Sequence, residues 1–101
     1  MSNFIEYKDR MAFHPGYYIQ EFVEERGLTQ KDFAKRLGTT PKNLSVLISG
    51  EQSLSIDIVV KLAAMLGTSE EYWFNLQTAW NEMMAEIHYD KQLELEKEVF
   101  K

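Results

Sequence analysis

The segment from Thr40 to Ser49 carries hydrogen-bonding side chains at positions that its apolar face leaves free. Lys42 can donate to guanine O6 and N7 or to a phosphate, and Asn43 can pair with adenine or hold the sugar-phosphate backbone. Thr40 offers a hydroxyl and a methyl group. Val46 has only apolar surface, whose natural base contact is a thymine methyl. The chemistry that these residues predict is contact with duplex DNA.

A helix predicted to begin at Thr29 and Gln30 extends this surface. The free backbone N–H groups at its start, together with the positive end of the helix dipole, suit a phosphate oxygen. Gln52 and Ser53, in the loop after the segment, are candidates for a second phosphate contact. The full set of predicted DNA-binding residues is Thr29, Gln30, Thr40, Pro41, Lys42, Asn43, Ser45, Val46 and Ser49.

Five helices are predicted to position these groups. The first starts at Pro15 and ends at Gly27, the second and third occupy residues 29–50 with a turn at Gly38, the fourth spans 56–66, and the fifth begins at 70. Proline suits a first helical turn, and glycine tolerates the left-handed backbone at which many helices end. Beyond His88 the helical pattern weakens, and no β-strand pattern appears. The predicted fold class is therefore all-α.

Composition limits the possible partners. A chain of 101 residues with 45% hydrophobic content fits one domain with a modest core. It has no cysteine and no stretch as long as a membrane span, which favours a cytoplasmic protein without a membrane partner. The net charge is -5, yet residues 28–68 hold five Lys or Arg against three Asp or Glu, a balance of +2, between acidic ends. Such ends must point away from a duplex, and they suit a basic protein.

The chain has no pattern typical of an enzyme. It lacks a glycine-rich phosphate loop and a nucleophile elbow, and its adjacent glutamates point in different helical directions. His14 and His88 are far apart in sequence and have no cysteine to complete a metal site. We therefore predict no catalytic residue, no metal and no cofactor. From periodicity alone, an ordinary helical hairpin inside a bundle explains residues 29–50 as well as a DNA-binding motif does.

Resemblance favours the DNA-binding motif. The stretch TQKDFAKRLGTTPKNLSVLISG resembles the helix-turn-helix of phage repressors, the Cro/C1 or XRE-like type. The segments HPGYYIQEFVEERGLTQ before it and LAAMLGTSEEYWFNLQTAWNEM after it are similar to the HigA family of bacterial antitoxins, over residues 14 to about 84. Pro41 departs from this pattern, because repressor-like proteins often place a base-reading side chain there. The resemblance implies a five-helix repressor-like fold with a long C-terminal helix.

The resemblance also implies partners. Members of this family form homodimers, bind double-stranded operator DNA to repress their own operon, and neutralise a basic, mRNA-cleaving ribonuclease toxin of the HigB-like type. For the toxin we predict contacts at Glu21, Glu24 and Glu25. The predicted dimerisation residues are Trp73, Leu76, Trp80 and Met84, because apolar side chains cover more than one face of the fifth helix. The alternative is that this apolar surface packs against the first and fourth helices or under the tail.

These predictions divide the chain into three parts: an N-terminal arm at residues 1–13, a helix-turn-helix DNA-binding domain at 14–68, and a C-terminal helix and tail at 69–101 that dimerises. The alternative function is a stand-alone phage-repressor-like regulator without a toxin partner. A purely protein-binding helical module is a third reading.

Overall fold

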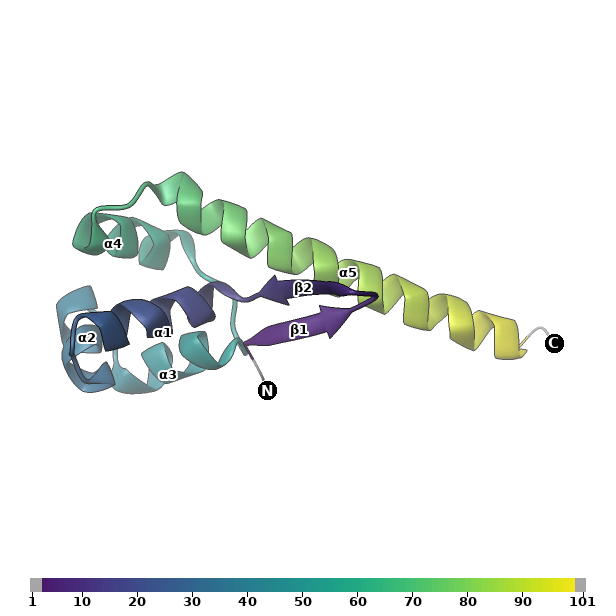
Figure 1. The fold of residues 1–101 in the computed structure, drawn as a ribbon. Helices are drawn as coiled ribbons and strands as arrows, with labels where there is room; N and C mark the ends of the chain where they lie inside the picture. The colour runs from purple at the N-terminus through teal and green to yellow at the C-terminus, as the bar shows by residue number, and fades with distance from the viewer. Residues whose placement is uncertain (1–2, 100–101) are drawn as a thin grey trace.

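Five helices and one β-hairpin make up the computed structural model, which describes residues 3–99 (Figure 1). Residues 1–2 of the predicted arm and 100–101 of the predicted tail lie outside this range. The elements are β1 (Phe4–Tyr7), β2 (Arg10–Phe13), α1 (Pro15–Glu25), α2 (Gln30–Leu37), α3 (Pro41–Ser49), α4 (Ile56–Leu66) and α5 (Glu70–Val99). The predicted all-α, helix-turn-helix fold class is confirmed, with the hairpin as a small addition.

Hydroxyl side chains cap the starts of three helices. Thr29, Thr40 and Ser55 each accept the backbone N–H of the residue three positions further on, at 3.1, 3.1 and 3.2 Å. Each hydroxyl satisfies a donor that has no partner inside its helix. Helix α2 ends at Gly38, whose φ of 82° lies in the left-handed region. The sequence therefore sets the ends of α2 and the start of α3, which fixes the turn between them.

A single core holds the four shorter helices against the start of α5. The largest side chains that are fully buried in it are Trp73, Phe33, Ile19, Leu44, Leu62 and Val59. The Trp73 indole N–H donates to the Thr68 hydroxyl at 2.8 Å, so its one polar atom is satisfied inside the core. The first turns of α5 thus pack with α1 and α4, and they orient the rest of this long helix.

Gly16 lets α1 approach α3 closely. A Cβ atom built on Gly16 would lie 2.0 Å from the Leu47 carbonyl oxygen and 2.8 Å from that of Ile48. Real contacts of a Cβ atom are never this short, so only glycine fits at this crossing. The glycine after Pro15 therefore sets the distance between α1 and the back of α3.

The prediction that no strand is present is wrong for the N-terminal arm. Strands β1 and β2 pair antiparallel, with Phe4 opposite Phe13 and Tyr7 opposite Arg10. The turn places Lys8 and Asp9 at positive φ, 49° and 62°. Two consecutive residues at positive φ give a turn whose twist matches that of the strands. The hairpin lies along the middle of α5 (Figure 1).

A second apolar cluster joins the hairpin to α5. It consists of the buried side chains Ala12, Trp80, Met83 and Ile87, with Ile5 and Tyr7 packed against them. This contact accounts for the apolar residues in the middle of α5, which the core of the shorter helices does not reach.

Polar contacts extend the attachment beyond this cluster. Asp90 accepts from the Lys8 ammonium at 2.8 Å and from the Tyr7 hydroxyl at 2.7 Å, and Arg10 pairs with Glu86. The Lys8 and Tyr7 hydrogen bonds lower the pKa of the Asp90 carboxyl. Helix α5 continues past these contacts, and Figure 1 shows its last turns projecting beyond the hairpin. In residues 3–99, no helix is long and apolar enough to cross a membrane.

Candidate nucleic-acid interface

Helices α2 and α3 and the turn between them form a helix-turn-helix. The Gly38 N–H donates to the carbonyl oxygens of Ala34 and Lys35, at 3.0 and 3.2 Å, which closes the end of α2. Helix α3 buries Leu44, Leu47 and Ile48. Its opposite face is therefore left toward solvent, as a helix that enters the major groove requires.

The nine predicted DNA-binding residues lie at or near the surface. Seven are exposed: Thr29, Gln30, Thr40, Pro41, Lys42, Asn43 and Ser45. Val46 and Ser49 are half-buried, and the Ser49 hydroxyl donates to the Val46 carbonyl oxygen at 2.8 Å. That hydroxyl proton is already used inside α3, so Ser49 has less to offer a base. The structure brings all nine residues to α2, α3 and the ends of these helices.

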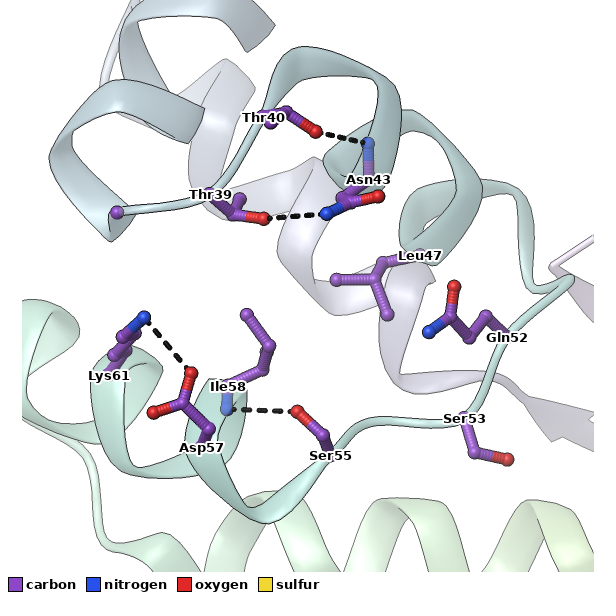
Figure 2. Close-up of a pocket in the computed structure, with 11 residues that line it drawn as sticks. Thr39, Thr40, Asn43, Leu47, Gln52, Ser53, Ser55, Asp57, Ile58 and Lys61 are labelled. Atoms are coloured by element: carbon purple, nitrogen blue, oxygen red, sulfur yellow. Dashed lines mark hydrogen bonds and ion pairs between the residues drawn. The ribbon is translucent and has the colours of Figure 1, made fainter.

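A groove of about 540 Å³ lies between this motif and the start of α4. Figure 2 shows Thr39, Thr40 and Asn43 on one side of it, with Ser55, Asp57 and Lys61 on the other. The Asn43 amide N–H donates to the Thr39 hydroxyl at 3.4 Å, a weak contact that a base or phosphate can replace. The groove also includes Gln52 and Ser53, the two loop residues predicted to bind a second phosphate.

The charge around this surface is mixed. Lys31, Lys35, Arg36 and Lys42 are exposed cations on α2 and α3. Asp57 lines the groove and is paired with Lys61, whose ammonium lies 3.0 Å from the carboxylate. This pairing offsets the one carboxylate in the groove, so its repulsion of phosphate is reduced.

The predicted toxin-binding residues Glu21, Glu24 and Glu25 are all exposed on α1. The Tyr17 hydroxyl donates to the Glu21 carboxylate, which raises the pKa of Tyr17. None of these residues lines the groove between α3 and α4. The three predicted toxin contacts therefore lie on a different helix from the exposed cations of α2 and α3, although α2 also carries the exposed Asp32.

Two of the predicted dimer residues, both tryptophans, are buried within the subunit. Trp73 is fully buried and Trp80 is 8% exposed, so both side chains are used inside the subunit. Leu76 is half-buried against the main core, and only Met84 is exposed. The physical reason is that α5 packs on the short helices at its start, the alternative that the sequence left open, and on the hairpin in its middle, which the sequence did not predict.

His14 is a positioning residue that sequence reasoning did not assign. It is 1% exposed, and its Nδ1 accepts the Gly16 N–H at 2.8 Å at the start of α1. Its ring lies edge-on to Trp80 and also hydrogen-bonds to the backbone of Gln52. Burial lowers the pKa of His14, and the Gln52 hydrogen bond opposes part of that effect. One neutral imidazole thus connects α1, the loop after α3 and α5.

Gln77 was also missed. It is 8% exposed, and its amide oxygen accepts the Leu54 N–H at 2.9 Å. Its amide nitrogen donates to Asn81 at 3.0 Å and to the Ser53 hydroxyl at 3.4 Å. The loop before α4 is therefore fixed to α5. His14 lies in the stretch HPGYYIQEFVEERGLTQ and Gln77 in LAAMLGTSEEYWFNLQTAWNEM, the two stretches that resemble the HigA family, so the resemblance marked both regions.

Comparison with known proteins agrees with this geometry. Residues 19–73 match the helix-turn-helix family. Antitoxin HigA-1 of Vibrio cholerae is 34% identical over 80 residues, which cover 79% of this chain and 75% of that protein. The chain belongs to the HigA family of helix-turn-helix proteins.

Two further proteins are similar to this HigA-family chain. An uncharacterised helix-turn-helix transcriptional regulator of Escherichia coli, YddM, is 35% identical over 83 residues, 80% of this chain and 88% of the relative. The structure of Pseudomonas aeruginosa antitoxin HigA with the higBA promoter has a TM-score of 0.74 and 26% identity. That comparison covers 83% of this chain and 92% of the other. The family is one of DNA-binding regulators and is not a family of enzymes.

Proposed function

We propose that this chain is the antitoxin of a type II toxin-antitoxin system. In this role it binds operator DNA as a homodimer and represses its own operon. It also neutralises a basic, mRNA-cleaving ribonuclease toxin by direct binding. The observation that carries the DNA part is the outward polar face of α3, with Lys42 and Asn43 exposed beside a groove. The Pseudomonas aeruginosa antitoxin HigA, whose structure was solved with the higBA promoter, supports DNA binding by this chain.

The separation of charge supports the toxin part. Exposed carboxylates of α1 lie outside the groove, and α5 adds further acidic residues from Glu70 onward. Acidic surface of this kind attracts a basic protein and speeds its association. Because the exposed glutamates of α1 lie on a different helix from Lys42 and Asn43, one chain can serve two partners.

Fluorescence anisotropy tests the DNA part. The full chain is titrated into a labelled duplex of its own promoter and into a scrambled duplex of equal length, over a range of salt concentrations. We expect tighter binding to the promoter, with affinity falling steeply as salt rises. Equal affinity for both duplexes at every salt concentration would contradict operator recognition.

Co-expression tests the toxin part. The chain carrying an affinity tag is produced together with the protein encoded beside it, and the retained complex is weighed by light scattering. We expect a stable complex with a small basic partner and loss of that partner's RNA-cleaving activity. Full cleavage activity in the presence of excess chain would remove the antitoxin assignment.

A stand-alone transcriptional regulator is the second candidate. The similarity to YddM favours it, because that relative is an uncharacterised transcriptional regulator of the helix-turn-helix type. This candidate predicts promoter binding without a toxin complex, so the two experiments together separate the two functions.

A further inference from the structure

Four hydroxyl side chains line the groove between the helix-turn-helix and α4: Thr39, Thr40, Ser53 and Ser55 (Figure 2). Each hydroxyl oxygen accepts an N–H group of the chain, at distances of 3.1 to 3.4 Å. In residues 3–99, none of the four donates its own proton to another group of the chain. A hydroxyl has one proton to donate, so each is left as a donor. The groove therefore suits a ligand that carries acceptors.

Ser53 differs from the other three hydroxyls because a distant element sets its direction. The others accept from groups three or four residues further along the chain. Ser53 instead accepts from the side chain of Gln77 on α5, 24 residues away, which is 8% exposed. The direction of this one donor therefore depends on a long-range contact.

The other partners of Gln77 fix the orientation of its amide. The amide oxygen accepts the Leu54 N–H at 2.9 Å, and a backbone N–H can only donate. The amide nitrogen must therefore face the other way, where it donates to the Asn81 side-chain oxygen at 3.0 Å. The same nitrogen faces the Ser53 oxygen at 3.4 Å, which is long for a strong hydrogen bond. It still presents a donor to that oxygen, so the Ser53 proton points away from Gln77.

We propose that Gln77 is a positioning residue for DNA binding, which keeps the Ser53 hydroxyl proton directed outward so that it donates to a phosphate oxygen of the duplex. A phosphate carries only acceptors, whereas base edges carry both donors and acceptors. Ser53 also lies in the loop after α3, outside the helix face that carries Lys42 and Asn43. The inference rests on the proposed function, and it extends the DNA-binding machinery to a residue of α5.

Promoter anisotropy of four full-length proteins tests the proposal: wild type, Ser53→Ala, Gln77→Glu and the double variant. Glutamate has the shape of glutamine, and one carboxylate oxygen can still accept the Leu54 N–H. The other oxygen accepts the Ser53 proton and turns it inward. We expect each single variant to bind the promoter about tenfold more weakly, the effect of losing one hydrogen bond to a charged group. In the Ser53→Ala background, Gln77→Glu should add little further loss.

Controls separate the positioning role from added charge and from misfolding. Thr78→Glu places the same charge at the exposed neighbouring position of α5, so its loss of affinity measures charge alone. Far-UV circular dichroism checks the fold, and Gln77→Met replaces Gln77→Glu in the same cycle if the latter does not fold. Because serine is neutral, Ser53→Ala should weaken promoter and scrambled duplexes by the same factor and leave the salt slope unchanged.

The outcomes separate this inference from the function on which it rests. Wild-type affinity in Ser53→Ala, or an equal loss from Gln77→Glu with and without the Ser53 hydroxyl, would overturn the positioning role while promoter binding by the wild type stands. A wild-type chain that binds neither duplex would remove the operator role and this inference together. Losses in both single variants that do not add in the double variant, beyond the loss in Thr78→Glu, support the proposal.

Discussion

Individual side chains at the interface have distinct chemical roles because their surroundings differ. Lys42 is exposed at the start of α3, where neither Pro41 before it nor Asn43 after it carries charge. Ser49 uses its hydroxyl proton inside the helix, and the Asn43 amide makes only a long contact to Thr39. Lys42 is therefore the residue of this face with the most to gain from a phosphate or a guanine.

Removing the Lys42 side chain measures how much its contact contributes to DNA affinity. We expect Lys42→Ala to weaken DNA binding, and the slope of log affinity against log salt to fall by about 1 if the partner is a phosphate. Loss confined to the promoter duplex would indicate contact with a base instead. Lys97→Ala on the far part of α5 is the control and should leave both affinity and slope unchanged. Anisotropy over a salt series measures all three proteins.

His14 should make stability depend on pH near neutrality. Burial holds its folded pKa below the ordinary value of 6.5, so the unfolded chain binds the proton first as the pH falls. The contribution of neutral His14 to the free energy of unfolding is therefore complete above pH 6.5, and it decreases as the pH falls below that value. In His14→Asn the helix keeps a capping acceptor but loses the titration. We expect Tm to fall less in this variant than in wild type between about pH 7.5 and about pH 5.5, where carboxylates titrate little.

Thermal melts monitored by circular dichroism give this comparison directly. The variant is expected to be less stable at every pH, because it loses the ring contact with Trp80. The relevant quantity is thus the difference in Tm between the two pH values. An equal difference in both proteins would show that His14 is not the titrating group.

At the scale of elements, the helices were predictable and the hairpin was not. Proline, glycine and hydroxyl residues mark the helix ends through local chemistry, so the sequence places α1 to α4 almost to the residue. The hairpin turn instead uses Lys8 and Asp9, where Asn-Gly or Asp-Gly is the usual signal. Phe4 and Met11 also lie exposed on its outer face, which obscures the alternation of apolar and polar residues.

The extension of α5 past His88 as far as Asp90 follows from the same missing element, whereas the described turns from there to Val99 have no contact with the hairpin to explain them. Beyond His88 the sequence has no apolar side for the short helices, so periodicity alone gave no reason to extend the helix. The hairpin supplies that reason through the contacts of Lys8 and Tyr7 with Asp90. The candidate DNA face was predictable because it depends on local spacing. The burial of Trp80 depends on a partner from the other end of the chain.

The crossing of α1 and α3 should tolerate no side chain at Gly16. We expect Gly16→Ala to lower the free energy of unfolding by about 2 to 3 kcal/mol or more, because a methyl group collides with the backbone of α3. Urea denaturation measures the change. Gly27→Ala is a control with no atom within 4 Å, so only its backbone strain of about 1 kcal/mol should appear. A similar loss in both variants would argue against the close approach.

On the scale of the whole molecule, charge is divided between surfaces. The exposed glutamates of α1 lie outside the groove, whereas α2 and α3 carry four exposed cations and the exposed Asp32, and Asp57 in the groove is paired with Lys61. A net charge of -5 is compatible with DNA binding only with such a division. A mutation in one surface should therefore change binding there and leave binding at the other surface unchanged.

A triple variant tests this independence. We expect Glu21→Gln, Glu24→Gln and Glu25→Gln together to slow association with a basic toxin severalfold, because they remove long-range attraction. Promoter affinity should stay equal to that of wild type or rise slightly. The reciprocal control is Lys42→Ala, which should leave toxin association unchanged. Surface plasmon resonance with each partner immobilised measures both. A large loss of promoter affinity in the triple variant would contradict the division.

The pairing of the hairpin with α5 has a consequence for how the chain is made. Ala12 leaves the ribosome long before Ile87, its neighbour in the second apolar cluster. At about 5 to 20 residues per second, the hairpin waits roughly 4 to 15 s for the helix that covers it. During translation the nascent chain therefore exposes an uncovered, strand-forming segment, and a chaperone that shields such segments should raise the yield of native protein.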